Sequence, residues 1–150
     1  NLPGLRSGFV AGDAAILREF LQYRTYHGCA MPLHHQLASI AAWEDEAHVL
    51  TNRRRYREKF EAVLPILQGH LDVSAPAAGF YLWPQTLVSD TEFARQLFAA
   101  EHVTVLPGRF LARQWDGRNP GENRVRIALV AELEDCVEAA QRIVSHLDSA

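Results

Sequence analysis

The hydrophobic period of this chain changes at Gly69, and that change limits the possible folds more than any other feature. Between Pro32 and Gly69, apolar residues recur every three or four positions, which predicts helix. The stretch is longer than the roughly 8–20 residues of an ordinary globular helix, so we expect one long helix or two joined near His48. Beyond Gly69 the apolar runs are short and are separated by Pro and Gly, which indicates strands.

The residues after Gly69 predict a small sheet with helices packed on it, which is an α/β arrangement. Ser89 and Glu92 form a capping-box pair that marks the start of a helix running to about Glu101. Glu132 begins a last helix, with acidic residues in its first turn and basic ones near its end. The expected order is strand, strand, helix, strand, strand, helix, with the strands at residues 72–74, 79–83, 103–106 and 124–130.

The first part of the chain is predicted to form one short strand followed by one helix. Residues 5–11 are predicted to form a short strand that Gly12 closes. Asp13 is a suitable N-cap for the next helix, and Gly28 is expected to end it.

The charge balance argues against several classes of function. The chain has 15 basic and 18 acidic side chains, a net charge of −3, and Lys59 as its single lysine. A general nucleic-acid binder normally shows a strong basic excess, so no nucleic-acid partner is expected. No apolar run reaches the roughly 20 residues of a membrane span, so no membrane partner is expected either. Cys29 and Cys136 lack metal-ligand spacing and are predicted to be free thiols in the cytoplasm, with no metal bound.

Most charged groups have an ordinary structural interpretation. The basic cluster at residues 53–57 is followed by Glu58 and Glu61, which stand four residues after Arg54 and Arg57 and suit ion pairs on a helix surface. Lys59 lies in the same charged helical run, where a solvated lysine is expected.

Charge patterning leaves Arg6 and Arg126 unexplained. Arg6 lies in a Pro-Gly loop among small residues. Arg126 alternates with Val125 and Ile127, so it is predicted to face away from the side of the strand that these two residues share. An arginine inside an apolar strand requires an anionic partner. That partner is either an acidic side chain of the protein or the carboxylate of a ligand, and the sequence favours neither.

Four segments resemble one family. Residues 1–9, Asn-Leu-Pro-Gly-Leu-Arg-Ser-Gly-Phe, resemble the segment that follows the cofactor lysine in fold type I pyridoxal-phosphate-dependent aminotransferases. Residues 77–82 are similar to that family's Gly-x-Phe-Tyr segment, and residues 103–111 to its V-x-x-x-P-G turn. Residues 123–129 look like its closing strand. The amino-acid sequence of the loops at residues 105–113 and 117–121 is most similar to that of the succinyldiaminopimelate transaminases of bacterial lysine biosynthesis.

The resemblance implies roles for particular residues. It implies that Arg6 binds the phosphate of pyridoxal 5'-phosphate, that Arg126 binds the α-carboxylate of the substrate, and that Phe80 packs near that substrate. The Schiff-base lysine would lie upstream of Asn1, so no catalytic residue is expected in this chain and the isolated chain is expected to be inactive. Arg109, Arg113 or Arg118 is a further hypothesis, based on charge and loop position, for binding a second, distal carboxylate.

The resemblance also implies how the chain is divided among domains and which reaction the complete enzyme catalyses. Residues 1–31 would be the tail of the large cofactor-binding domain, residues 32–69 a long interdomain helix or helix pair, and residues 70–150 the small C-terminal α/β domain. The complete enzyme is expected to be a cytoplasmic homodimer that moves an amino group between glutamate or 2-oxoglutarate and an amino acid, with N-succinyl-diaminopimelate as the expected substrate.

Other interpretations remain open at the level of sequence. One is another class I/II amino acid aminotransferase or a C–S lyase. Another is an aminotransferase-like regulatory domain without catalysis, which a winged-helix segment upstream would distinguish. The third is a free-standing binding module without cofactor. Fold alone does not separate these interpretations.

Overall fold

The computed structural model describes residues 3–149. Its internal contacts divide the chain into two compact units, Asn1–Leu50 and Thr51–Ala150. Among the described residues, no helix has the length and apolar character needed to cross a membrane.

The first unit is helical. After the short 3-10 helix η1 (Pro3–Leu5), the chain forms α1 (Ala14–His27) and α2 (Leu33–Glu44). Asp13 caps α1 as predicted, because its carboxylate accepts hydrogen bonds from the backbone N–H groups of Ala15 at 2.9 Å and Ile16 at 3.1 Å. The predicted strand at residues 5–11 is wrong: residues 3–5 are helical and residues 6–11 form no regular element.

The long helical stretch is two helices, which confirms one of the two predicted forms. The second helix, α3 (Glu46–Leu67), is separated from α2 by Asp45. Asp45 adopts an extended conformation, with φ −91° and ψ 97°. Its carboxylate accepts the N–H of Ala47 at 3.0 Å and lies 3.2 Å from Nδ1 of His48. Asp45 therefore ends one helix and caps the next, three residues before the expected junction.

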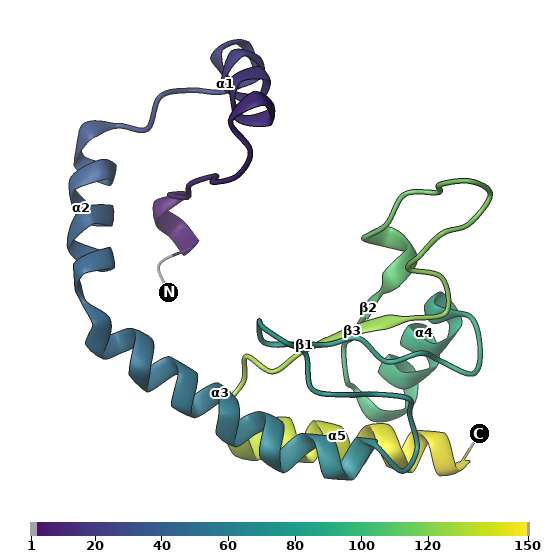
Figure 1. Ribbon diagram of the computed structural model, residues 1–150. Helices are drawn as coiled ribbons and strands as arrows, with labels where there is room; N and C mark the ends of the chain where they lie inside the picture. The colour runs from purple at the N-terminus through teal and green to yellow at the C-terminus, as the bar shows by residue number, and fades with distance from the viewer. Residues whose placement is uncertain (1–2, 150) are drawn as a thin grey trace. The chain divides into compact units, whose positions relative to one another are not determined.

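The second unit contains a small antiparallel sheet (Figure 1). Its strands are β1 (Tyr81–Leu82), β2 (Leu106–Pro107) and β3 (Val125–Ala128), in the order β1-β3-β2. Three of the predicted strands are present but shorter than expected. The fourth, at residues 72–74, is wrong, because only Asp72 pairs there, in an isolated bridge with Gln85.

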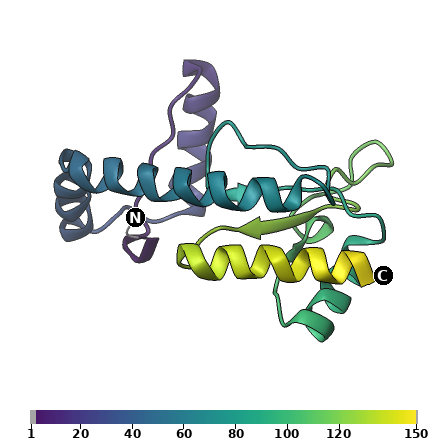
Figure 2. The ribbon, with the colours of Figure 1, turned by 90° about the horizontal axis from the view of Figure 1, so that it is seen from below.

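Helices cover the sheet and complete the core of the second unit. The C-terminal half of α3 and α5 (Leu133–Ser149) run along the sheet, as Figure 2 shows, and α4 (Asp90–Glu101) contacts both α5 and β2. The buried core draws on all of these elements, including Val63, Leu67, Leu82, Leu97, Val125, Leu129, Ala140 and Ile143.

The side-chain hydrogen bonds at the start of α4 differ from the predicted capping box. Ser89 is the N-cap residue, as predicted, but its side chain makes no capping hydrogen bond. Its hydroxyl instead lies 3.0 Å from Oγ1 of Thr91 and accepts from Arg109 at 3.2 Å. Glu92 pairs with Arg95 and Gln96 along the helix. The expected capping box is therefore wrong, although the helix begins where it was placed.

Candidate functional site

The residues that alternate with Arg126 along β3 contribute to the core. Val125 and Leu129 are buried, and Ile127 packs against the same core. Arg126 alternates with them along the strand, as the sequence predicts. The structure shows that it is half-buried. The strand therefore places one guanidinium on the face of the sheet that does not carry the core.

Arg126 has an aromatic neighbour. Its Cζ atom lies over the ring of Tyr81, 4.5 Å from the ring centroid. Within residues 3–149, no carboxylate forms an ion pair with Arg126. The structural ion pair that the sequence left open is thus absent from the described residues, and the N–H donors of Arg126 are free to bind an external anion.

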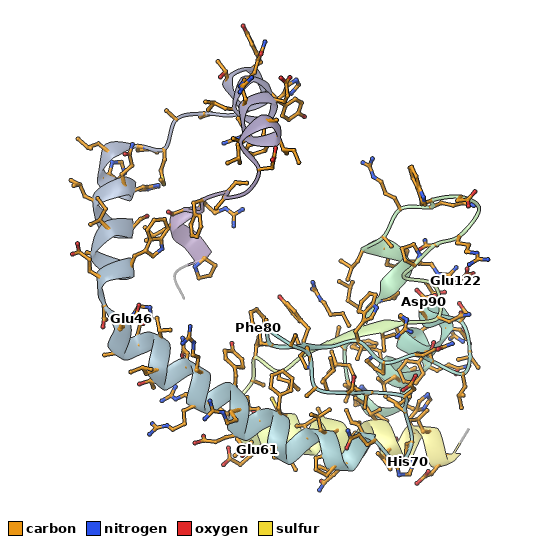
Figure 3. All side chains as sticks on the ribbon, viewed as in Figure 1. Glu46, Glu61, His70, Phe80, Asp90 and Glu122 are labelled. Atoms are coloured by element: carbon orange, nitrogen blue, oxygen red, sulfur yellow. The ribbon has the colours of Figure 1, made fainter. Side chains whose placement is uncertain are left out.

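Phe80 lies beside this arginine through a stack of rings. It is half-buried and directly precedes β1; Figure 3 labels it. Its ring centroid lies 4.2 Å from that of Tyr81 and 5.3 Å from that of Tyr56 in α3. The structure therefore brings the two predicted substrate-binding residues, Phe80 and Arg126, together around Tyr81.

Lys59 is not the solvated lysine that the sequence predicts. It is half-buried, and its Nζ donates a hydrogen bond to the carbonyl oxygen of Leu129 at 3.2 Å. The same atom lies 5.3 Å from the ring centroid of Tyr56. The physical reason is its helical position, one turn from Tyr56 on the side that faces β3. Of the two expected surface ion pairs nearby, Arg54–Glu58 forms, at 3.9 Å.

The structure separates the three loop arginines that were candidates for a distal carboxylate. Arg109 is already paired: its guanidinium contacts the buried carboxylate of Asp90 at 2.6 Å, and its Nε donates to the same group at 2.7 Å. Arg109 is therefore a wrong candidate. Arg113 and Arg118 are exposed, and within residues 3–149 neither side chain forms an ion pair.

Arg118 belongs to a small hairpin. The backbones of Trp115 and Arg118 exchange hydrogen bonds at 2.8 and 2.9 Å. The two residues between them, Asp116 and Gly117, both have positive φ, of 48° and 73°. This is the conformation of a tight hairpin turn, and an Asp-Gly pair favours it. The hairpin thus gives Arg118 a defined backbone position.

Arg6 lies in the first unit, in a loop that suits an anion. Its backbone is left-handed, with φ 53°, and its guanidinium contacts the carbonyl oxygen of Pro3 at 3.5 Å. The side chain is exposed, and no carboxylate within residues 3–149 pairs with it. The adjacent Ser7 has a buried Oγ without a hydrogen-bond partner among the described residues. A free cation and an unsatisfied hydroxyl fit a group that carries a phosphate.

A cavity of about 400 Å³ lies between α3, residues 103–106, β3 and α5. Its lining is mainly aliphatic and includes Val63, Leu67, Ile127 and Ile143. Cys136 also lines it, and burial raises the pKa of this thiol, so the reactive thiolate is disfavoured. Arg126 also lines this cavity, so the cavity extends from the aliphatic core to the arginine.

Sequence reasoning missed three residues of this region: Tyr56, Tyr81 and Asp90. Tyr81 carried a usable signal, because it stands in the expected strand directly after Phe80. Tyr56 and Asp90 carried none, since their partners lie 24 and 19 positions away.

Comparison with known proteins gives one consistent family. Residues 1–143 match the family described as aminotransferase class I and II. A probable aminotransferase of Mycobacterium tuberculosis is 35% identical over 95% of this chain. The chain spans only about a third of that relative's length, 33%.

Solved structures that resemble this chain also include aminotransferases. The crystal structure of an aminotransferase from Neisseria meningitidis is 59% identical, with a TM-score of 0.81 over 96% of this chain and 37% of the other. A probable N-succinyldiaminopimelate aminotransferase from Thermus thermophilus is 38% identical, with a TM-score of 0.52 over 62% of this chain and 24% of the other. The family's members depend on pyridoxal phosphate, and they share the fold type I architecture of this chain. The chain belongs to the class I and II aminotransferases.

Proposed function

We propose that the complete protein is a pyridoxal-phosphate-dependent aminotransferase in which Arg126 binds the α-carboxylate of the substrate. The observation that carries this proposal is the position of the Arg126 guanidinium over Tyr81, with no carboxylate of residues 3–149 as its ion-pair partner. The planar fork of an arginine suits a carboxylate, because two parallel N–H donors meet its two oxygens.

The other residues of the chain have supporting roles in this proposal. Arg126 fixes the direction of the bound carboxylate and so orients the bond at the substrate's α-carbon for cleavage. Phe80 packs against the substrate beside that carboxylate, where it excludes water. Arg6 binds the phosphate of the cofactor. When bound, pyridoxal phosphate supplies an electron sink for the substrate's negative charge.

We propose glutamate and 2-oxoglutarate as one substrate pair and N-succinyl-diaminopimelate as the other substrate. The 38% identity to the probable N-succinyldiaminopimelate aminotransferase supports this choice. Two exposed guanidiniums, those of Arg113 and Arg118, support it further, because a succinyl group ends in a carboxylate that needs a cationic partner. We also propose that the complete enzyme is a cytoplasmic homodimer.

The proposal is tested by Arg126→Ala in the complete protein. The kcat/KM for glutamate is expected to fall by roughly 100- to 1,000-fold, because the substrate carboxylate loses its charged partner. Arg124→Ala is the matched control. Arg124 directly precedes β3, two residues from Arg126, but its guanidinium donates to the carbonyl of Trp83 at 3.0 Å, and its loss should leave kcat/KM nearly unchanged. An unchanged kcat/KM in Arg126→Ala would reject Arg126 as the carboxylate ligand.

The same assay tests the substrate. In the double variant Arg113→Ala, Arg118→Ala, the KM for N-succinyl-diaminopimelate should rise about tenfold or more, while the KM for glutamate stays constant. An equal effect on both substrates, or none, would reject the distal-carboxylate proposal and leave another amino acid aminotransferase in its place.

A further inference from the structure

A continuous row of stacked groups connects α3 to Arg126. Tyr56 and Phe80 stack with ring centroids 5.3 Å apart and planes at 20°. Phe80 and Tyr81 follow at 4.2 Å and 40°, and Arg126 lies over Tyr81 at 4.5 Å. We call Tyr56, Phe80 and Tyr81 the aromatic stack. Arg126 is thus the last member of an ordered row and not an isolated surface cation.

The register of the sheet explains why Tyr81 and Arg126 meet. Tyr81 pairs directly with Ala128 across β1 and β3. Arg126 is two residues from Ala128, so it lies on the same face of the sheet, diagonally across from Tyr81. Aromatic and long side chains reach each other across such a diagonal. The contact is therefore set by strand pairing.

The other end of the aromatic stack is tied to the same sheet. Lys59 lies over Tyr56 at 5.3 Å and donates to the carbonyl oxygen of Leu129 at 3.2 Å. The backbone N–H of Leu129 donates to the carbonyl oxygen of Phe80 at 3.0 Å. Leu129 is buried in the core. Both ends of the row are therefore connected to β3 and its exit, which limits how far the rings can move.

We propose that Tyr81 is a positioning residue that holds the guanidinium of Arg126 in place before the substrate binds. This inference rests on the proposed role of Arg126. A free arginine has many rotamers, and ordering them on binding weakens affinity. A ring below Cζ attracts the cation through its π face and uses none of its five N–H donors, so all of them remain for a carboxylate.

The test uses glutarate, which has the two carboxylates of glutamate but no amino group and so cannot react. Its Kd is measured by calorimetry with the complete holoenzyme. Tyr81→Leu should raise the Kd roughly 5- to 30-fold, as expected for the loss of a partly desolvated cation–π contact. Tyr81→Phe, which keeps the ring, should change it by less than about twofold. An equal rise in Tyr81→Phe would overturn the inference, because the hydroxyl would then be the acting group.

A second arm separates positioning from a merely structural role. Replacing Tyr81 with a fluorinated phenylalanine keeps the shape but weakens the ring's attraction for a cation, so the Kd should rise with fluorination while the unfolding midpoint stays constant. A Kd that does not respond to fluorination overturns the inference, even if Tyr81→Leu fails to fold.

A double-mutant cycle distinguishes this inference from the proposed function. Fluorination at position 81 should have no further effect on the Kd in the Arg126→Ala background, because the two groups act together. If the two changes affect the Kd additively, the positioning role of Tyr81 is overturned, and the proposed role of Arg126 is not. If Arg126→Ala itself leaves the Kd for glutarate unchanged, the proposed function of Arg126 fails, whatever Tyr81 does.

Discussion

Asp90 is a fully buried carboxylate, with 0% of its surface exposed, at the first residue of α4. It accepts hydrogen bonds from the backbone N–H of Arg109 at 3.0 Å and of Asn123 at 3.4 Å, and it pairs with the guanidinium of Arg109 (Figure 3 labels Asp90). Burial alone would raise the pKa of Asp90, but these hydrogen bonds hold the pKa below its usual value. Asp90, while charged, therefore joins the segment that follows β2 to the segment that precedes β3.

We predict that Asp90→Asn destabilises the protein by about 2–3 kcal/mol. This is less than the 3–5 kcal/mol typical of a broken, fully buried pair, because Arg109 is partly exposed. The lowered pKa means that the stabilisation from Asp90 is complete above about pH 4 and is lost as the pH falls through the folded-state pKa. The difference in unfolding free energy between wild type and variant, from urea denaturation, should therefore shrink in acid. A difference that stays constant with pH contradicts this.

Residue roles could be predicted from sequence only where the pattern is local. The alternation around Arg126 is visible within five residues, and its orientation was predicted correctly. The Asp90–Arg109 pair joins positions 19 apart in a chain rich in both charges, and no spacing rule selects it. Arg109 was therefore mistaken for a ligand-binding residue.

At the scale of elements, helices were predictable and short strands were less so. A helix bonds within its own sequence, so α1 and α4 begin at their predicted caps and α4 ends at Glu101. A strand depends on a distant partner. Residues 72–74 have a plausible strand composition, yet only the single bridge from Asp72 to Gln85 forms. β3 forms because it pairs with β1 on one side and β2 on the other, and β1 forms because it pairs with β3.

The loop between β2 and β3 closes at two glycines, and we predict that it tolerates no side chain there. A Cβ on Gly108 would meet the carbonyl oxygens of Gly121 and Arg124, and a Cβ on Gly121 would meet the backbone of Gly108. Gly108→Ala should therefore destabilise the protein by about 1–3 kcal/mol, as overpacking does. The measurement is the free energy of unfolding in urea.

Gly69→Ala is the matched control for this substitution. A Cβ on Gly69 meets nothing within 4 Å, so this variant should differ from wild type by no more than about 0.5 kcal/mol. Equal losses in the two variants would contradict the role of the close approach between the two loop segments, because an added Cβ on Gly69 makes no such contact.

At the scale of the whole molecule, the two units differ in how they bury their apolar side chains. The second unit has a continuous core. In the first, α1 has no buried residue, and Ile16 and Leu21 are 70% and 69% exposed. We expect the remainder of a larger cofactor-binding domain to cover these side chains, in line with the 33% of the relative's length that the chain spans. The division into domains at residues 31 and 69 stays a prediction.

The last prediction concerns the 150 residues as an isolated chain. Their single lysine, Lys59, donates to Leu129 and lies over Tyr56, so its amine is held by the fold. A lysine that reacts with a carbonyl must be deprotonated and accessible. We therefore expect the isolated chain, mixed with pyridoxal phosphate, to show no transamination and no visible absorption band from an imine. Lys59→Arg serves as the control, because an arginine cannot form that imine. A band that appears in the wild-type chain and disappears in Lys59→Arg would identify Lys59 as a reactive lysine and contradict its structural role.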